Sequence, residues 1–557
     1  ASRQNNAVQE TSNVGRFRNG FTPVEVAYAV DEGGSVRFEI GAYDRSRALV
    51  IDPLLASTFI GGGGADAVQA MAVDAQTNVY VAGYTDSSDF PVTVSPVSPA
   101  PAGGQDVFIS RFDGALGTLS ASAYLGGSSN DQATAIGLDA SARVWVAGWT
   151  ESTNFPSPSS PLCTTNNGGR DAFVAILNGS LSSLIQATYL GGSNADHAAA
   201  IAMDNASARQ FVAGYTESDN FPVTASGYQR TFGGARDAFL VVFSNAVGAA
   251  DYKAGTFLGG TNADEIAALT VSPRNGVNNF VYAVGSTYSG DFPVTNSYQS
   301  LHGGASDAFI SRLGTLLNSL SASTLLGYTG TDMAYAVGLD ASNKLYVAGR
   351  TDSSTFIRSP AGFVYYPGHT NMYHGGVDGF ITCFTNNITN VYASTLVGGV
   401  GDEEVRAIAV ARDSISTNNT ERVYLAGWTT SDHFPVAKAG VAFDSAWNGG
   451  QDAFVMRFDA RLTNMYSGTY LGGAGNEQAL ALVLSPDSNT IFVAGITASG
   501  DFPSSDAPYD SIFRGGASDG FVSKFPASLA YGTIKWMKEI NDTSGCSSPA
   551  MMWDGIV

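Results

Sequence analysis

Hydrophobic residues are grouped along the chain in short runs, separated by polar segments rich in Gly, Pro, Asn and Ser. Residues 134–139 alternate between apolar and small or polar positions, as in a half-buried strand, whereas residues 172–177 are continuously apolar, as in a strand covered on both faces. β-Branched and aromatic residues fill these runs, and no segment shows a convincing helical spacing. The pattern therefore predicts an all-β protein.

Four short signatures recur in a fixed order, which indicates an internal repeat. A strand ending in Gly-Gly comes first, at residues 61–62, 126–127, 191–192, 259–260, 398–399 and 472–473, with Gly-Tyr at 327–328. A Val-Ala-Gly type segment ends at Gly83, Gly148, Gly214, Gly285, Gly349, Gly427 and Gly495. Asp/Asn-Phe-Pro follows, with Phe90, Phe155, Phe221, Phe292, Phe434 and Phe502, and a degraded copy at Phe356. Gly-Gly-x-Asp-x-Phe closes the unit, with Asp106, Asp171, Asp237, Asp307, Asp378, Asp452 and Asp519.

Seven such units, each with four strand signals, predict a seven-bladed β-propeller with four antiparallel strands per blade. A single blade cannot bury both of its faces, so the blades must stack around an axis. We assign residues 55–540 to the propeller, 1–19 to a flexible tail, 20–54 to an N-terminal β-hairpin segment and 541–557 to a C-terminal extension. The hairpin is predicted from strands at 24–30 and 35–43 around the turn at 31–34.

The ordered motifs resemble the SBBP-type β-propeller repeat over about residues 55–537, and residues 35–53 resemble the segment that precedes such propellers. Proteins with this repeat are mainly secreted or surface proteins of bacteria. The resemblance implies a propeller fold and an extracellular or cell-surface location. It implies no single activity, because the family has none in common.

The composition narrows the class of partner. The chain has 557 residues, with 28 Lys and Arg against 49 Asp and Glu, and a formal net charge of −21. Such a charge disfavours nucleic acid and anionic membranes, and favours cations, basic proteins or neutral glycans. No apolar run is long enough to span a membrane. The three cysteines have no metal-ligand spacing, and the start at Ala1 without a signal peptide suggests a processed product.

The number of predicted outer strands exceeds the number of blades by one. Residues 55–60 are expected to close the ring on blade seven, which makes a C-terminal strand containing Leu529, Tyr531, Ile534 and Trp536 surplus. That strand could pair with a second copy and build a fibre or a surface array. Alternatively, it packs beside the hairpin or begins a further domain.

Acidic residues recur at two positions of the unit. The Asp of Gly-Gly-x-Asp is expected to cap a turn, since a catalytic group is needed once and this residue appears seven times. The second position follows Gly-Gly, with Asp66, Asp131, Asp196, Asp264, Asp332, Asp402 (or Glu403) and Glu477. These carboxylates either cap turns or form a ring that binds a cation such as calcium near one mouth of the central channel. No metal centre or other cofactor is predicted.

Departures from the repeat indicate where a ligand could bind. Unit five loses its second Gly and gains a loop with Tyr365, Tyr366, His369, Tyr373 and His374, which suits a protein or glycan ligand or is a self-packed insertion. The repeated Phe of Phe-Pro either anchors its loop or offers an exposed ring for sugar stacking. Possible N-glycosylation sequons begin at Asn178, Asn205, Asn387, Asn418 and Asn541.

The chain shows no recognisable catalytic motif, and its five His residues occupy unrelated positions in the repeat. We therefore expect a non-enzymatic extracellular scaffold that binds protein or polysaccharide and self-associates. A lectin-like module is the first alternative, and it predicts exposed aromatic residues on the face that carries the long loops. An enzyme acting on polysaccharide is the second alternative.

Overall fold

The computed structural model describes residues 26–30, 36–40 and 54–529, apart from 94–96, 99, 159–160, 273–278, 358–372, 374–375, 413–420, 437–441 and 506–507. All regular structure in these segments is β-strand. The same segments contain no helix that is long and apolar enough to cross a bilayer.

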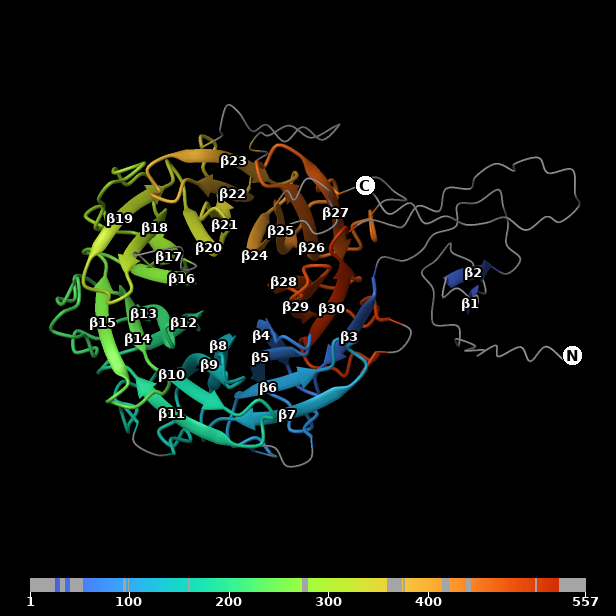
Figure 1. The fold of residues 1–557 in the computed structure, drawn as a ribbon, viewed down its shortest axis with the longest axis horizontal. Helices are drawn as coiled ribbons and strands as arrows, with labels where there is room; N and C mark the ends of the chain where they lie inside the picture. Colours follow the sequence, from blue (N-terminus) through green and yellow to red (C-terminus); the bar gives the residue numbers. More distant parts are fainter. Residues whose placement is uncertain are drawn as a thin grey trace, which may run out of the picture.

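Seven four-stranded antiparallel sheets form a ring, which confirms the predicted seven-bladed propeller (Figure 1). The inner strands of blades one to seven are β4 (Asp66–Val73), β8 (Asp131–Leu138), β12 (Asp196–Asp204), β16 (Asp264–Val271), β20 (Asp332–Leu339), β24 (Glu403–Arg412) and β28 (Glu477–Leu484). The second strands are β5 (Val79–Thr85), β9 (Val144–Thr150), β13 (Arg209–Thr216), β17 (Phe280–Thr287), β21 (Leu345–Thr351), β25 (Glu421–Thr429) and β29 (Thr490–Thr497). The third strands are β6 (Asp106–Phe112), β10 (Asp171–Leu177), β14 (Asp237–Phe243), β18 (Asp307–Gly314), β22 (Asp378–Phe384), β26 (Asp452–Asp459) and β30 (Asp519–Pro526). The outer strands of blades one to six are β7 (Leu119–Leu125), β11 (Leu184–Leu190), β15 (Tyr252–Leu258), β19 (Leu320–Leu326), β23 (Val391–Val397) and β27 (Met465–Leu471).

The outer strand of blade seven comes from the N-terminal side of the chain, as the strand count predicts. β3 (Ala56–Ile60) pairs antiparallel with β30, from Ala56 opposite Lys524 to Ile60 opposite Gly520 (Figure 1). The described chain ends at Leu529, whose φ is 50° and whose N–H donates to the Pro526 carbonyl at 3.0 Å. Leu529 is therefore a turn residue, and its assignment to a strand was wrong, because Pro526–Leu529 forms the tight turn that follows the third strand.

The glycine of Val-Ala-Gly has a steric role in every blade. Each inner strand has a bulge opposite this glycine, for instance between Ala479 and Ala481 opposite Gly495. The extra residue pushes a backbone carbonyl into the space above the glycine, so that a Cβ on Gly495 would overlap the Gln478 oxygen. A residue without a side chain is consequently needed at this point of close backbone approach.

The phenylalanine of Phe-Pro anchors the long loop between the second and third strands. Phe155 is 4% exposed and packs on Phe173 of the third strand with 4.5 Å between ring centroids. Phe356 makes the same contact with Phe380 at 4.6 Å, although the motif around it is degraded. The anchoring interpretation is thus confirmed, because these rings are buried and not available to a ligand.

The long loops also join neighbouring blades. The Tyr228 N–H of blade three donates to the Leu317 carbonyl in a turn of blade four at 2.8 Å. The Tyr509 N–H of blade seven donates in the same way to Leu116 of blade one at 3.0 Å. The hydrophobic core likewise lies between blades, since Ile109 of blade one and Phe173 of blade two belong to one buried cluster. We call the side of the ring that carries these loops and the Gly-Gly turns the long-loop face.

The N-terminal segment contains a separate pair of strands at the predicted position. β1 (Val26–Val30) pairs antiparallel with β2 (Val36–Ile40), in the register Val26 opposite Ile40. The predicted turn at 31–34 lies outside the described residues.

Candidate functional site

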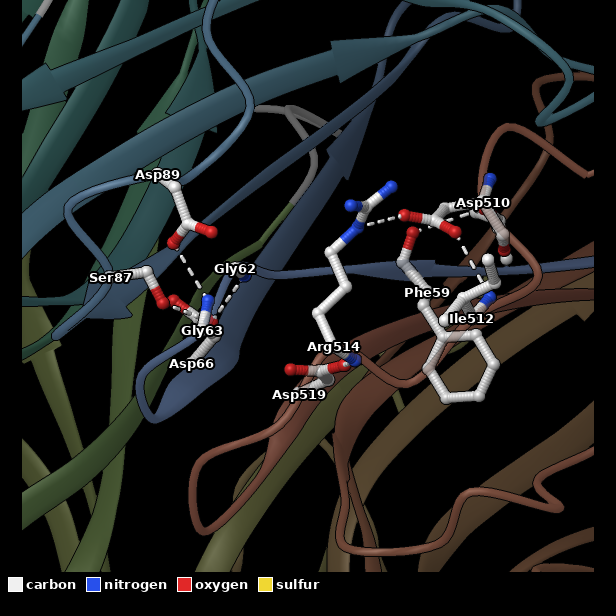
Figure 2. Close-up of polar contacts among 11 residues, drawn as sticks. Phe59, Gly62, Gly63, Asp66, Ser87, Asp89, Asp510, Ile512, Arg514 and Asp519 are labelled. Carbon is white, nitrogen blue, oxygen red and sulfur yellow. Dashed lines mark hydrogen bonds and ion pairs between the residues drawn. The ribbon is translucent and has the colours of Figure 1, made fainter.

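Two carboxylates lie at every junction between blades on the long-loop face. Figure 2 shows the junction that closes the ring, where Asp66 accepts hydrogen bonds from the Gly62 N–H at 2.7 Å and the Ser87 hydroxyl at 2.8 Å. Asp519 accepts one from the Arg514 N–H at 2.7 Å. Both aspartates are fully buried. They hold the turns that lead into β4 and β30, as expected for Asp at such positions.

The predicted ring of acidic residues has this capping role at each blade. Its members with 0% exposure are Asp66, Asp131, Asp196, Asp264, Asp332, Glu403 and Glu477. Asp402, named at the sixth position, is wrong, because it is exposed in the preceding loop and Glu403 accepts the Gly399 N–H at 2.8 Å instead. Among the described residues, no three His, Cys, Asp or Glu side chains are grouped as metal ligands. The ring residues therefore cap turns, and calcium binding by this protein stays a prediction.

A belt of arginine, glutamate and aromatic side chains lies around the ring axis on the long-loop face, at the ends of the inner strands and their neighbours. We call it the axial belt. It consists of Trp149, Glu151, Arg170, His197, Tyr215, Glu217, Arg236, Glu265, Tyr335, Arg350, Glu404 and Arg406, which come from blades two to six.

In blades two and three, each arginine lies over an aromatic ring. The Arg170 guanidinium is 4.0 Å from the centroid of Trp149, and that of Arg236 is 4.0 Å from the centroid of Tyr215. Cation–π contacts of this kind fix the arginine while its edge stays free to donate hydrogen bonds. His197 stacks on Tyr215 with 5.1 Å between centroids. Burial, together with the nearby positive charge of Arg170 and Arg236, lowers the pKa of His197 to about 4, so the imidazole is neutral.

Salt bridges connect the belt from blade to blade. Arg236 binds Glu217 of its own blade at 2.8 Å and reaches Glu265 of blade four at 3.5 Å. Glu404 of blade six binds Arg350 of blade five at 2.9 Å. Four arginines and four glutamates make the belt neutral, although the whole chain carries −21.

Blades seven and one contribute no arginine to the belt, although blade one has Tyr84 and Asp86 at the positions of Tyr215 and Glu217. The position that His197 and Glu265 occupy on the inner strand is Ala67 in blade one and Gln478 in blade seven. Among the described residues, the side chain of Gln478 makes one hydrogen bond, in which its amide group donates to the Gln451 amide oxygen at 3.4 Å. The axial belt therefore does not close around the axis. A ligand at the axis would contact chemically different surfaces on its different sides.

Three half-exposed tyrosines lie in blades four and five, Tyr288 near Arg350 of the axial belt and Tyr298 and Tyr328 near the outer strand β19. Tyr288, Tyr298 and Tyr328 are 39%, 38% and 38% exposed. Tyr298 has a raised pKa, chiefly because of burial and in addition because Tyr328 is adjacent. Tyr328 occupies the position of the second glycine of Gly-Gly, so this departure from the repeat places an aromatic ring on the surface.

The predicted tyrosine-rich loop is described at one residue. Tyr373 is half-buried, and its hydroxyl donates to the Gly376 carbonyl. Its pKa is raised, first by burial and then by Asp378, Asp352 and other acidic neighbours. Tyr365, Tyr366, His369 and His374 lie outside the described residues, and so do Tyr531, Ile534 and Trp536 of the predicted assembly strand.

The described sequons lie in turns between consecutive strands of a blade, β10 and β11 for Asn178, β12 and β13 for Asn205, and β22 and β23 for Asn387. Asn205 and Asn387 are exposed, and Asn178 is half-buried in the turn before β11. Asn418 and Asn541 lie outside the described residues. Glycosylation of these residues stays a prediction.

The axial belt was not found from the sequence. Its members stand at positions where the seven units differ, whereas the motifs are the positions where the units agree. Aligning the units at Gly-Gly-x-Asp would have shown Arg170 and Arg236 directly before the Asp, where the other blades have Gln, Ser or Val. The signal was therefore present in the variation between repeats.

A shallow recess also lies at the rim between blades one and two. It has a volume of about 730 Å³ and is lined by Val97, Leu125, Pro156, Ser157 and neighbouring residues. Its lining offers hydroxyl and apolar groups and no titratable side chain, so the charged chemistry of the protein is at the axis.

Comparison with known proteins supports the fold. The SBBP family model, described as a beta-propeller repeat, matches residues 57–91. Together with the seven blades, this match confirms the resemblance seen in the motifs. No curated protein sequence matches the chain.

Several solved structures are similar at low identity. The WD40 domain of Neurospora crassa Pan2 is 9% identical, with 86% of this chain and 97% of that chain covered and a TM-score of 0.39. Raptor from Chaetomium thermophilum is 11% identical over 84% of this chain and 29% of its own length, with a TM-score of 0.41. A quinohemoprotein alcohol dehydrogenase from Pseudomonas putida HK5 is 10% identical over 90% and 79%, with a TM-score of 0.39. Similarity at this level carries no argument about activity.

Proposed function

We propose that this seven-bladed propeller, which carries the SBBP-type beta-propeller repeat, is a non-enzymatic scaffold of the extracellular space or cell surface that binds polysaccharide at the axial belt. The observation that carries the proposal is the pairing of Arg236 with the Tyr215 ring at 4.0 Å and with Glu217 at 2.8 Å. A sugar presents hydroxyl groups in pairs and an apolar ring face. Guanidinium and carboxylate groups bond the hydroxyl pairs. The faces of the Tyr215 ring are occupied by Arg236 and His197, so the apolar face of a sugar would be covered by half-exposed tyrosines outside the belt.

The charge of the belt favours a neutral polysaccharide. Each arginine already has a glutamate partner, so the belt offers no surplus positive charge to a polyanion, and the remaining surface of the protein is acidic. The half-exposed Tyr288, Tyr298 and Tyr328 extend the aromatic surface away from the axis. A polymer is a suitable ligand because the axial belt spans five blades, so a single sugar ring could contact only part of it.

A panel of neutral polysaccharides, probed with the whole protein, tests the proposal. We expect binding to at least one of them, with an affinity that falls about tenfold or more in Arg236→Ala, since charge-assisted hydrogen bonds of about 1.5–3 kcal/mol are lost. Arg312→Ala is the matched control, because Arg312 also lies over an aromatic ring, that of Phe280 at 4.3 Å, but in blade four, near the ends of β17 and β18 that lie away from the long-loop face. Binding that is confined to a basic protein, or equal loss in both variants, contradicts the proposal.

A second role, self-association through the C-terminal segment, is favoured by the closure of blade seven. β3 occupies the outer position of that blade, so the four-stranded sheet is complete without the residues that follow Leu529. When the sequence after the Leu529 turn is aligned with that after the Leu116 turn of blade one, Lys535 takes the position of Ser122 and Lys538 that of Leu125, both of which are buried. Lysines at these positions would bury their charge, so the segment is poorly suited to be an outer strand against an apolar surface. We infer that the segment pairs with a second copy.

Deletion of residues 530–557 is expected to abolish oligomers seen by electron microscopy, whereas deletion of 541–557 leaves them intact. Oligomers that persist after the longer deletion contradict self-association through this segment.

A further inference from the structure

Five junctions between blades bury two aspartates next to each other. Each pair combines the first residue of a third strand with the first residue of the next inner strand. The pairs are Asp519 with Asp66, Asp106 with Asp131, Asp171 with Asp196, Asp237 with Asp264, and Asp307 with Asp332. All ten side chains have 0% exposure. None of them takes part in the salt bridges of the described residues.

The two carboxylates of a pair flank one glycine of the Gly-Gly motif. At Gly259, a Cβ would stand 2.8 Å from Asp237 Oδ1 and 2.8 Å from Asp264 Oδ2. At Gly61, the corresponding distances are 2.6 Å to Asp519 Oδ1 and 2.9 Å to Asp66 Oδ2. Oδ1 of the third-strand aspartate and Oδ2 of the inner-strand aspartate therefore border the same small space beside the glycine.

One oxygen on each side lacks a well-directed hydrogen bond. Asp264 Oδ2 accepts from the Gly260 N–H at 2.7 Å and from the Ser289 hydroxyl at 2.8 Å. Asp237 Oδ2 accepts from the Gly233 N–H at 2.8 Å and from the Gln229 side-chain amide at 3.3 Å, and Oδ1 of both residues is buried without a well-directed hydrogen bond. The Thr287 hydroxyl beside Asp264 lowers the pKa of that carboxyl, but by less than burial raises it. An ionised, buried carboxylate with an unbonded oxygen is unfavourable, and two of them side by side repel each other.

A proton fits this arrangement better than a metal ion. Calcium takes six to eight oxygen ligands at about 2.3–2.6 Å, and the space between the carboxylates is bounded by the glycine backbone. A proton needs no space of its own, and it turns one unbonded oxygen into a donor. We propose that each of the five aspartate pairs holds a proton in the folded protein, so that the propeller gains stability as the solution becomes acidic.

The pKa values agree with this proposal. Burial raises the pKa of Asp171, Asp237 and Asp519 to about 7, and the facing aspartate raises it further in each case. Burial likewise raises the pKa of Asp131 and Asp196 to about 6. Since the pair shares its proton, these values describe the pair more than either residue.

Other charged groups around the pairs are mostly acidic and act in the same direction. Asp510 faces Asp519, Asp86 faces Asp66, Glu217 faces Asp196, Asp291 faces Asp237 and Asp264, and Asp352 faces Asp332. Two basic side chains oppose them, since Arg514 lowers the pKa of Asp519 and His302 lowers that of Asp307. The other three pairs have no basic neighbour among the groups that affect their pKa.

The sign of the pH dependence follows from these raised values. Between about pH 4, where an unfolded Asp titrates, and about pH 7, the folded chain binds more protons than the unfolded chain. Stability is therefore fully present near the lower limit and is lost as the pH rises through the folded pKa values. The melting temperature of the whole protein should fall from about pH 5 to pH 8, and unfolding at about pH 6 should release protons to the buffer.

Asp237→Asn tests one pair directly, because its amide group places a permanent donor where the proton would be. We expect this variant to melt at a higher temperature than the unmodified protein at about pH 8, with a smaller fall between pH 5 and 8. Asp219→Asn removes one charge at an exposed position that is not among the groups that raise the pKa of the pairs, and it should leave the profile unchanged. Asp171→Asn repeats the test at a second junction if the first variant does not fold.

Calorimetry in two buffers of different ionisation enthalpy counts the protons exchanged, and it needs no variant. Uptake of protons on unfolding at about pH 6, or a melting temperature that rises towards pH 8, overturns the proposal. Metal analysis that finds several calcium ions per chain, with loss of stability on chelation, overturns it in favour of cation binding.

Discussion

Ser57 and Ser523 are separated by 466 positions in the sequence, and their side-chain oxygens share a hydrogen bond of 2.8 Å. The same pair recurs as Ser110 with Ser122 in blade one, where 12 positions separate the residues. β3 thus reproduces the contacts of an ordinary outer strand, although it reaches blade seven from the other end of the chain. Closing the ring in this way makes the stability of blade seven depend on the segment around residue 57.

The first prediction concerns this closure. Phe59 is 1% exposed and packs edge-on against Phe502 and Phe513 at 5.9 and 6.4 Å between ring centroids. Phe59→Ala should lower the free energy of unfolding by about 3–5 kcal/mol, because it leaves a cavity at the point where the ring closes. Denaturant unfolding followed by tryptophan fluorescence measures this loss. Leu55→Ala, at a residue that is 51% exposed just before the same strand, should change it by less than about 0.5 kcal/mol.

The second prediction tests the steric role of the Val-Ala-Gly glycine. Gly495→Ala forces a methyl group onto the Gln478 carbonyl at the bulge of β28, and we expect a loss of about 1–3 kcal/mol or more. Gly500→Ala, five residues later in the same blade, has no heavy atom within 4 Å and should be nearly neutral. Melting temperatures that are equal for the two variants would show that the bulge relaxes to accept a side chain.

The third prediction concerns the anchor of the long loop. Phe155→Ala removes the ring that packs on Phe173 at 4.5 Å and Tyr189 at 6.3 Å, which should destabilise blade two by about 3–5 kcal/mol. Limited proteolysis should then cut the loop after β9 faster. Ile185→Ala, at a residue that is 40% exposed on the outer strand of the same blade, is the control. Unchanged protease resistance in Phe155→Ala would mean that other contacts hold the loop.

The fourth prediction separates ligand binding from folding on the long-loop face. Tyr328→Gly restores the residue that the other units have at this position, so the fold should be retained. Loss of the exposed ring should weaken polysaccharide binding by about 1 kcal/mol, or roughly fivefold. Tyr392→Ala, equally exposed at 38% but on an outer strand, should leave the affinity unchanged in the same titration. An affinity that falls only in Tyr392→Ala would place the ligand on the rim of the ring.

Much of the fold could be predicted because each blade repeats the same local requirements. Gly495 is needed opposite a bulge, Phe155 fills a pocket within its own blade, and Asp66 caps a turn four residues away. Such requirements act over short distances and therefore appear as motifs in the order of the chain. The sequence alone thus determined the β-strands, their grouping into seven blades and the structural role of the repeated residues.

The tertiary structure decided which segments and side chains meet. Both β3 and the segment after Leu529 were candidates for one outer position, and β3 fills it, with Phe59 buried against the surface that β30 offers. The axial belt arises in the same way, since Arg236 meets Glu265 only because neighbouring blades converge at the axis. The sequence around each of these residues does not indicate which residue it contacts, because the partner belongs to another blade or to the other end of the chain. These contacts could therefore be identified only from the tertiary structure.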